Sequence, residues 1–506
     1  MKKILIFWSI AVAAIALMFA TAPAMAAPEG KIVVAFDTDT PTMDPHGHAE
    51  RAGVIINWHL FDSLFFRQKD MKVVPGLIKG YSVVDDVTVD LDLRDDVKFH
   101  NGEPFTAASV KFSMERVLDP ASKSPRITAI NWLESAEIAG DYKVRLHFKQ
   151  PYPLWMEEMQ NFAMVPPKYI QEKGQEYFAE HPVGTGPYKF VKWSRGQEIV
   201  LEANPEYFKG APRIKTVVFK IIPDSSTQIA ALLSGAVDVV RNVTPEDRAV
   251  IDAKKNLKTV SVPILRFQWF YLADALNPDS PLSDKRVRQA INYAANVPRI
   301  INDIVGGLGT QTVCLNPMHF GFNPDLKPYP YDPEKARALL KEAGYDASQE
   351  LTLNYAIVNM IKGDEVVQAL QSDLAQVGIK IRLQKWSGVG YMDLVKSGRA
   401  APIFGLNWGS FGVFDGDAIL YPFFHSTQQY GFFHTDELDK LIMAQHTMMD
   451  AEKRKAIMGK IQEIIREEAP WIFMYAFHSI KAFNTKLDFQ PRSDETFYAY
   501  EIGFKR

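Results

Sequence analysis

The sequence predicts an α/β protein with several domains. Segments typical of strands and of amphipathic helices alternate along its 506 residues without a strict repeat, which is the pattern of α/β folds. The composition is 47% hydrophobic and 23% charged, which excludes a disordered or collagen-like chain. No change of composition marks a boundary between blocks. We therefore expect domains that are joined by crossing segments rather than by one flexible linker.

Three segments are typical of strands. Residues 31–36, KIVVAF, form a short apolar run that predicts a buried strand. In residues 88–93, TVDLDL, apolar and acidic side chains alternate, which predicts one packed face and one solvated face. Residues 144–148 repeat this alternation, with Arg145 and His147 on the outer face. These patterns predict at least one buried sheet and one sheet that is covered on a single face.

The first helices begin and end at recognisable residues. Thr106 precedes a helical pattern and is placed to cap it. Asp224 is placed to cap a second helix, and Gly235 is typical of a helix end because glycine adopts positive φ without strain. A strand is expected next, over residues 237–240.

The second half of the chain continues the alternation. Ser283 is expected to cap a helix whose apolar residues recur at helical spacing. Asp332 caps the next predicted helix, and Gly344 ends it. The run over residues 364–376 then leads into a predicted strand at 379–383, which is a helix-to-strand unit of the α/β type.

The first residues predict export. Two lysines follow Met1, and residues 4–20 are almost entirely apolar. Ala24-Met25-Ala26 then matches the small-x-small pattern of a signal peptidase site, so we expect cleavage near Ala26 and an exported mature protein. The alternative is an uncleaved membrane anchor, because the apolar run exceeds the usual signal core of about 7–15 residues.

Composition and motifs exclude several functions. The net charge of −3 leaves no basic surplus for binding nucleic acid. The single cysteine, Cys314, cannot form an intrachain disulfide, and we interpret it as a buried, inert thiol. His46 and His48 form a close pair in a turn, which we interpret as solvated rather than metal-bound. We therefore expect no metal and no cofactor.

No motif of a known catalytic class occurs, including the nucleophile elbow, the zinc-binding helix and the phosphate-binding loop. The sequence thus favours a protein that performs no chemistry. A catalytic site that is assembled only in space is not detected by motifs, so an exported hydrolase is the alternative class.

Long motifs along the whole mature chain resemble those of a known family. The most specific is VGTGPYKFVKW at residues 183–193, followed by IVLEANPEYFKGAPR at 199–213. Further matches are MDPHGHA at 43–49, LFDSLFF at 60–66, LRDDVKFHNGEPFTAASVKFSMERV at 93–117, SDKRVRQAINYA at 283–294 and YDPEKARALLKEAGY at 331–345. Together they resemble the bacterial extracellular solute-binding proteins of family 5, which are the oligopeptide, dipeptide and nickel receptors of ABC importers.

The resemblance implies a two-lobed periplasmic-binding-protein fold, similar to type II, with a satellite domain inserted in the first lobe. Lobe I is expected to comprise residues 27–58, 183–265 and 478–506, with the satellite domain at 59–182 and lobe II at 266–477. The implied partners are a small-molecule or peptide ligand and an inner-membrane ABC permease. A monomer is expected.

The resemblance also directs attention to one loop. Peptide-binding members place a carboxylate after a tryptophan, in a W-x-x-D-Y pattern, to bind the peptide amine. Here Trp408 is followed by Phe411 where the aspartate would stand, and Asp415 comes later. Either the loop carries an insertion and Asp415 binds the amine, or this protein does not anchor an amine.

Other candidate ligand contacts follow from residue type. Arg266 lies in a predicted crossing strand that is otherwise poor in charge, which suits either bidentate binding of a carboxylate or an internal salt bridge. Thr40 and Thr42 follow the first strand, where the family's cleft is lined, and are candidate hydrogen-bond donors. The candidate flat walls, each with core packing as its alternative, are Trp269, Trp386, Trp408 and Phe411.

The sequence therefore predicts a periplasmic receptor that captures a di- or oligopeptide between two lobes and delivers it to an ABC permease. Within that class the alternative ligand is a non-peptide organic acid or a metal chelate, because Phe411 replaces the expected aspartate.

Overall fold

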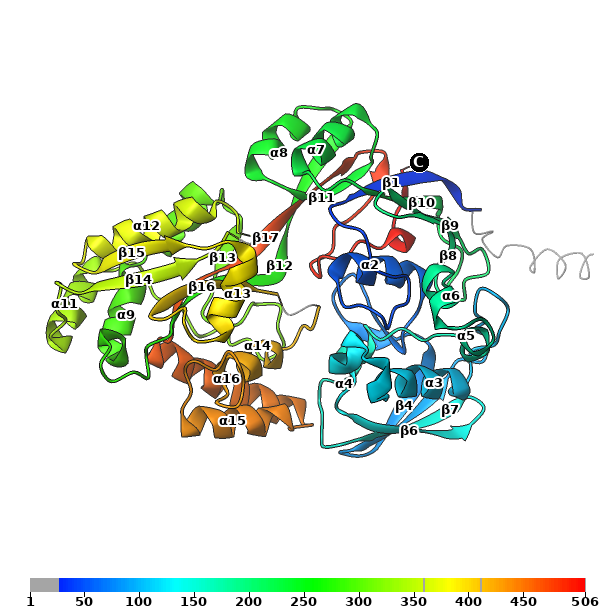
Figure 1. Ribbon diagram of the computed structural model, residues 1–506, viewed down its shortest axis with the longest axis horizontal. Helices are drawn as coiled ribbons and strands as arrows, with labels where there is room; N and C mark the ends of the chain where they lie inside the picture. Colours follow the sequence, from blue (N-terminus) through cyan, green and yellow to red (C-terminus); the bar gives the residue numbers. More distant parts are fainter. Residues whose placement is uncertain (1–26, 358–359, 410–411, 506) are drawn as a thin grey trace, which may run out of the picture.

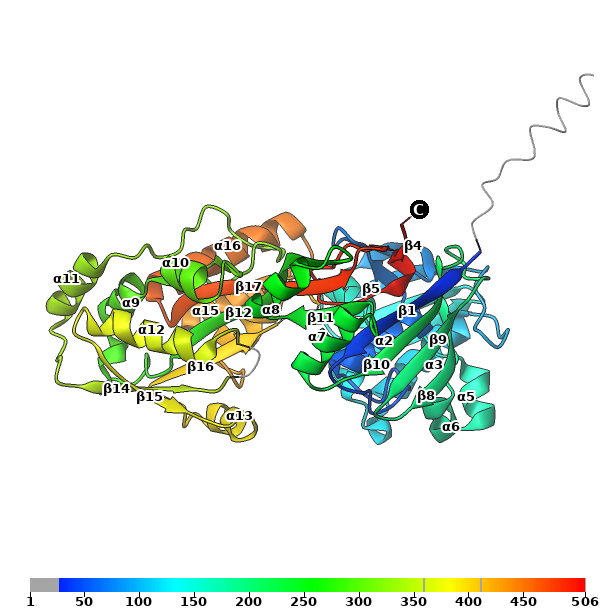
Figure 2. The ribbon, with the colours of Figure 1, turned by 90° about the horizontal axis from the view of Figure 1, so that it is seen from above.

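The computed structural model, which describes residues 27–357, 360–409 and 412–505, has two lobes and a satellite domain (Figure 1). Lobe I and the satellite domain lie on one side and are mainly blue to teal, with green segments at α7 and α8 and a red C-terminal segment; lobe II lies on the other side and is mainly green to orange. The view from above shows the same two bodies, connected by extended strands (Figure 2). This confirms the predicted fold class.

One mixed sheet runs through both lobes. Within the described residues it has eleven strands in the order β15-β14-β16-β12-β17-β11-β1-β10-β9-β8, and β13 pairs with β17 beside that path. The lobe I strands are β1 (Glu29–Phe36), β8 (Tyr188–Ser194), β9 (Glu198–Ala203), β10 (Ile214–Ile221) and β11 (Val239–Val243). The lobe II strands are β13 (Gly309–Gln311), β14 (Glu350–Tyr355), β15 (Lys380–Lys385) and β16 (Ile403–Trp408).

Two long strands connect the lobes. β12 (Leu257–Leu272) and β17 (Trp471–Asn484) pair antiparallel along most of their length. β17 also pairs with β11 in lobe I, and β12 also pairs with β16 in lobe II. The register between β12 and β17 is interrupted from Pro263 to Phe267, at the passage between the lobes. An interrupted two-stranded connection is the kind of element that absorbs the backbone changes of hinge closure.

Local capping signals position the lobe I helices. Asp224 caps α7 (Ser225–Ser234) by accepting from the Thr227 N–H at 2.7 Å, and Gly235 ends the helix with φ +78°. β11 begins at Val239, two residues later than expected, and the preceding Asp238 side chain accepts from the Val33 N–H at 2.9 Å. The other helices here are α2 (Arg51–Leu60) and α8 (Pro245–Asp252).

The satellite domain contains a separate four-stranded sheet in the order β4-β5-β7-β6. Its elements are β2 (Phe65–Arg67), β3 (Val73–Pro75), β4 (Ile78–Asp85), β5 (Thr88–Leu93), α3 (Ala107–Leu118), β6 (Leu133–Gly140), β7 (Lys143–Phe148) and α4 (Trp155–Met159). Thr106 forms a capping box at the start of α3. The satellite core extends to Met164, whereas Val165, Ile170 and Phe178 pack into the lobe I core. The helices α5 (Pro167–Lys173) and α6 (Gln175–Glu180) are thus attached to lobe I.

Lobe II surrounds its part of the sheet with helices. They are α9 (Lys285–Ala294), α10 (Val297–Arg299), α11 (Pro333–Ala343), α12 (Gly363–Ala375), α13 (Gly388–Lys396), α14 (Asp417–Phe424), α15 (Asp436–His446) and α16 (Ala451–Glu468). Asp332 and Gly344 bound α11 as predicted. The predicted cap of α9 is wrong by one residue. Asp284 accepts from the Arg286 N–H at 2.8 Å, whereas the Ser283 hydroxyl donates to the Ser280 carbonyl in the preceding turn.

No helix among the described residues has both the length and the apolar character required to span a bilayer.

Candidate ligand-binding site

A cavity of about 310 Å³ lies between the two lobes. This volume is at the lower end of the range of roughly 300–1,000 Å³ that is usual for small-molecule sites. Arg51 at the start of α2 belongs to lobe I, whereas the other lining residues belong to β12, β16, α13 and neighbouring turns of lobe II. They include Arg266, Met360, Tyr391, Met392, Gly405 and Trp408. A molecule in this cavity would contact both lobes at once.

Two arginines of the cavity wall meet one carboxylate. Glu495 accepts from Arg51 Nη2 at 2.7 Å, and its Oε2 lies 3.8 Å from Arg266 Nη2. Burial alone would raise the pKa of Glu495, but the surrounding basic groups hold it below its usual value. Glu495 is therefore ionised and neutralises part of the charge at this wall.

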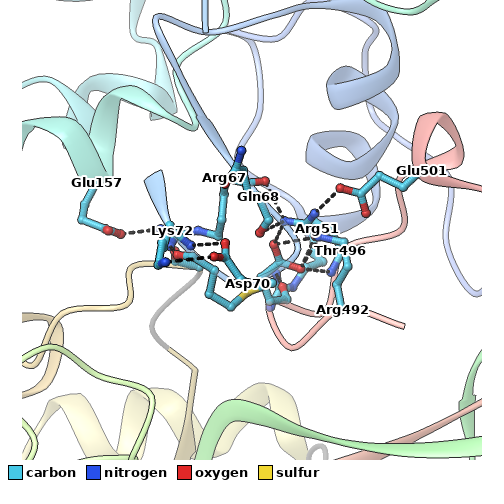
Figure 3. Close-up of polar contacts among 12 residues, drawn as sticks. Arg51, Arg67, Gln68, Asp70, Lys72, Glu157, Arg492, Thr496 and Glu501 are labelled. Atoms are coloured by element: carbon cyan, nitrogen blue, oxygen red, sulfur yellow. Dashed lines mark hydrogen bonds and ion pairs between the residues drawn. The ribbon is translucent and has the colours of Figure 1, made fainter. Parts of the chain in front are cut away.

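The position of Glu495 is set by ion pairs and hydrogen bonds that its neighbours in the chain form. Arg492 forms an ion pair with Asp494 and donates to Glu501 at 2.8 Å and to the Arg67 carbonyl at 3.0 Å (Figure 3). Glu495 itself has a left-handed backbone with φ +59°, which costs a residue with a Cβ about 1–2 kcal/mol. The C-terminal segment thus holds one carboxylate at the cleft in a strained conformation.

Two further basic groups lie near Glu495. Lys481 on β17 is 5% exposed, and its Nζ donates to the Asn242 side chain at 3.3 Å. Arg241 on β11 lies over the ring of Phe36, with its Cζ 4.5 Å from the ring centroid. In the described part of the chain neither cation has a carboxylate within 4.0 Å. We call Arg51, Arg241, Arg266 and Lys481 the basic cluster.

The charges of the basic cluster act on one another. The pKa of Lys481 is lowered to about 7, mainly because burial disfavours its charged form; Glu495 opposes this effect, and the three arginines add to it. Burial likewise lowers the pKa of Arg241 to about 10, against the attraction of Asp37. Burial, together with the repulsion between these cations, thus makes both groups easier to deprotonate than they are in water.

The remaining walls are mostly apolar. The Trp408 ring packs edge-on against Phe423 with 5.2 Å between centroids. The Tyr391 hydroxyl is within hydrogen-bond distance of the Gly405 carbonyl, at 2.6 Å. A Cβ at Gly405 would come within 2.8 Å of the Phe270 ring, so only glycine fits there. Met360 and Met392 supply flexible thioether side chains, which adapt to irregular ligands.

Among the predicted ligand contacts, Arg266 and Trp408 line the cavity. Trp269 is 2% exposed and stacks on Trp471 with 4.4 Å between ring centroids, so it occupies the core of lobe II. Trp386 is 38% exposed, and its indole N–H donates to Asn354 at 2.8 Å outside the cavity lining. In this structure Trp269 therefore packs in the core, which was the alternative to ligand contact.

The predicted threonine donors are engaged within their own loop. The Thr40 hydroxyl donates to the Thr42 carbonyl at 2.7 Å, and the Thr42 hydroxyl accepts from the Asp44 N–H at 3.1 Å. Neither residue is in the cavity lining. Both side chains thus form hydrogen bonds within the turn between β1 and α2.

Asp415 is already paired in the structure. It is 5% exposed and forms two hydrogen bonds with Arg454 on α16, at 2.5 and 2.7 Å. Its carboxylate is therefore not available to a ligand amine in this conformation. Phe411, the other residue of this prediction, lies outside the described residues.

The sequence reasoning missed most of the basic cluster. Lys481 had a detectable signal, because it is a charged residue within the buried apolar strand β17. Arg51 and Glu495 had none, because they are 444 residues apart and only the fold brings them together.

His46, His48 and Cys314 are all buried in the structure. His46 and His48 are buried rather than solvated, which corrects the prediction for this pair; His46 Nε2 lies 2.9 Å from the Ala163 carbonyl and His48 Nε2 lies 3.0 Å from the Asn57 amide. Cys314 is 1% exposed, as expected. Over the ranges that the structure describes, no group of three or more metal-ligating side chains occurs.

A two-lobed fold with a ligand-sized cavity between the lobes defines a solute-binding protein. Residues 72–431 match the family model of bacterial extracellular solute-binding proteins, family 5 middle, and the chain belongs to this family. Members of the family are transport receptors of ABC importers rather than enzymes, which rules out the exported hydrolase.

Relatives and solved structures agree with this assignment. The glutathione-binding protein GsiB of Salmonella typhi is 29% identical over 466 residues, with 89% of each chain covered. The substrate-binding protein CtaP of Listeria monocytogenes has the same fold with a TM-score of 0.85, 24% identity and coverage of 94% and 99%. DppA of Helicobacter pylori, solved with the peptide STSA, has a TM-score of 0.75, 24% identity and coverage of 94% and 98%.

Proposed function

We propose that this receptor captures a short peptide with a free carboxylate in the cavity between its lobes and delivers it to an inner-membrane ABC permease. The observation that carries the proposal is the position of Arg51 and Arg266, which approach one cavity from different sides. Guanidinium groups bind carboxylates in bidentate geometry, and apolar walls cover the rest of a peptide. The names of the relatives support a peptide-like ligand, since glutathione is itself a tripeptide.

The limited cavity volume supports a ligand of two or three residues rather than a long peptide. A second candidate is an organic acid without an amine. It is favoured by Asp415, whose pairing with Arg454 leaves no obvious amine anchor among the described residues at this loop.

Export and oligomeric state belong to the same proposal. Residues 1–26 direct export to the periplasm and are removed there, and the mature receptor acts as a monomer. Mass spectrometry of the protein from a periplasmic extract measures the cleavage site, and light scattering measures the mass in solution.

The ligand is tested by following thermal unfolding and calorimetric binding with dipeptides, tripeptides including glutathione, and organic acids. A ligand at 100 times its Kd adds about 2.7 kcal/mol to the free energy of unfolding. Arg266→Ala should weaken binding by about 2–5 kcal/mol if this guanidinium pairs with a buried ligand carboxylate. Arg382→Ala, at an exposed position on β15, is the matched control. Unchanged affinity of the Arg266 variant, with the fold intact, would contradict the proposal.

A further inference from the structure

We propose that the cavity selects ligands in which one carboxylate adjoins an uncharged, apolar side chain, which in a peptide means an apolar residue at the carboxyl end. The inference rests on the proposed function and names the ligand class of the same site. It starts from the division of the cavity wall into two parts. One part is cationic and contains Arg51 and Arg266, and the other has no charged side chain among the described residues that line it.

The cationic part accommodates one ligand charge. Glu495 accepts from Arg51 at 2.7 Å and lies 3.8 Å from Arg266, so one resident carboxylate faces two guanidinium groups. One positive charge of this pair is left for the ligand. Asn407, which also lines the cavity, accepts from Arg266 Nη1 at 3.4 Å and keeps that guanidinium at the wall. A second charge on the ligand would find no oppositely charged partner among the described side chains of the lining.

The uncharged part of the wall begins directly beside Arg266. In the antiparallel pair of β12 and β16, Phe267 lies opposite Trp408. Arg266 therefore has Trp408 and Gly409 as its neighbours across the sheet. A Cβ at Gly409 would lie 3.7 Å from the Cβ of Arg266, so the absence of a side chain leaves space along this arginine. A carboxylate at Arg266 thus places the group attached to it next to the Trp408 ring.

Two methionines from different elements complete the uncharged part. Met360 lies just before α12, and Met392 is on α13. A methionine side chain is unbranched and rotates about three bonds, so it adapts to apolar groups of different shapes. Its sulfur is only a weak hydrogen-bond acceptor. This wall therefore suits the side chains of methionine, leucine or phenylalanine, and it offers little to an amide or a charge.

Tyr391 contributes the one hydroxyl among the described side chains of the lining, and this hydroxyl is already engaged. Its oxygen lies 2.9 Å from the Asn354 carbonyl and 2.6 Å from the Gly405 carbonyl. Because a phenol has a single proton, that proton is used within lobe II. A polar ligand group that is enclosed here loses its water without a full replacement, which disfavours binding. An apolar group gains from the same burial.

The first test is calorimetry at pH 7 with the dipeptides Ala-Met, Ala-Gln, Ala-Glu and Ala-Lys, whose second side chains are similar in length but differ in polarity and charge. We expect Ala-Met to bind at least tenfold more tightly than each of the others. A smaller advantage, or tighter binding of glutathione than of Ala-Met, would overturn the inference and leave the proposed function intact. Binding of hexanoate without binding of any peptide would support the ligand class and overturn the peptide proposal. No binding by any probe would overturn both.

The second test uses variants of the methionine wall. Met360→Gln and Met392→Gln each place an amide in the lining and should lower the preference for Ala-Met over Ala-Gln at least threefold. Met449→Gln is the matched control, because Met449 is also partly buried but lies in the turn between α15 and α16, outside the cavity lining. A preference that is the same in both wall variants and in this control would contradict the role of the wall.

A third measurement needs no variant and decides the question if neither wall variant folds. Burial of apolar surface makes the heat-capacity change of binding negative. For the unmodified protein, this change should be more negative with Ala-Met than with Ala-Gln. Equal heat-capacity changes for the two dipeptides would overturn the inference.

Discussion

The guanidinium of Arg67 in the satellite domain lies on the ring of Phe414 in lobe II, with its Cζ 4.4 Å from the ring centroid. It also donates to the Gly412 carbonyl at 2.9 Å and forms an ion pair with Glu157, whose carboxylate accepts from the Phe414 N–H at 3.2 Å. The two sides of the cleft are therefore connected here as well as through β12 and β17. Because Arg492 donates to the Arg67 carbonyl, this contact is next to the segment that carries Glu495 (Figure 3).

We predict that Arg67→Ala separates the satellite domain from lobe II and lowers the stability of the protein. The change leaves Glu157 without its counter-ion, and breaking a buried pair costs about 3–5 kcal/mol. Solution scattering of the ligand-free variant should give a larger radius of gyration, and its thermal midpoint should fall. Arg195→Ala, which removes an exposed arginine over Trp193, is the control. Identical scattering curves for the Arg67 variant and the unmodified protein would show that the contact does not hold the lobes together.

The same interface predicts a dependence of stability on pH. The pKa of Glu158 is raised to about 8, mainly because burial disfavours the charged carboxylate; Arg126 opposes this effect, while Glu157 and Asp417 add to it. In the folded protein the Glu158 carboxyl keeps its proton up to about pH 8, whereas in the unfolded chain it loses that proton near pH 4.5. The contribution of Glu158 to stability is therefore fully present below pH 4.5 and is lost as the pH rises toward 8.

Glu158→Gln should remove that loss, because the amide resembles the protonated acid. We expect the thermal midpoint of the variant to decline less than that of the unmodified protein between pH 5 and pH 8. Glu172→Gln, at an exposed position on α5, should retain the original slope. Parallel curves for the Glu158 variant and the unmodified protein would contradict the assignment.

Ligand binding should take up a proton at Lys481. Its pKa in the ligand-free protein is about 7, and a ligand anion would raise it, as Glu495 already does against the effect of Arg51, Arg241 and Arg266. Affinity should therefore fall as the pH rises above 7. Calorimetry in two buffers with different ionisation enthalpies measures the proton uptake near pH 8. Lys481→Met should abolish it, and an uptake that persists in this variant would assign the proton to another group.

Asp415→Asn distinguishes a structural role from an amine anchor. Because Asp415 pairs with Arg454 inside lobe II, we expect the free energy of unfolding to fall by about 3–5 kcal/mol. Relative to the unmodified protein, the variant should bind the free and the acetylated form of one peptide with the same change in affinity. Selective loss of the free amine form would restore Asp415 as a ligand contact. Asp279→Asn, at an exposed turn, is the control for stability.

Sequence alone was sufficient at most of the helix ends, where the structure depends on local interactions. Asp224 with Gly235, and Asp332 with Gly344, bound their helices as predicted, because caps form between residues that are close in sequence. The one-residue error at Ser283 occurred where two adjacent residues are both good caps, and the choice depended on how the preceding turn folded. The order of the long motifs was likewise sufficient to identify the family and hence the two-lobed fold.

Sequence determined that the chain is an α/β solute-binding protein, whereas only the tertiary structure decided which side chains face the cavity. Trp269 and Trp408 lie on the paired strands β12 and β16, yet one is in the core and the other lines the cavity. Arg51, Arg266 and Glu495 meet although they are distant along the chain. The physical reason is that periodicity records which residues are buried within one element, but the partner of a charged group depends on how separate elements pack.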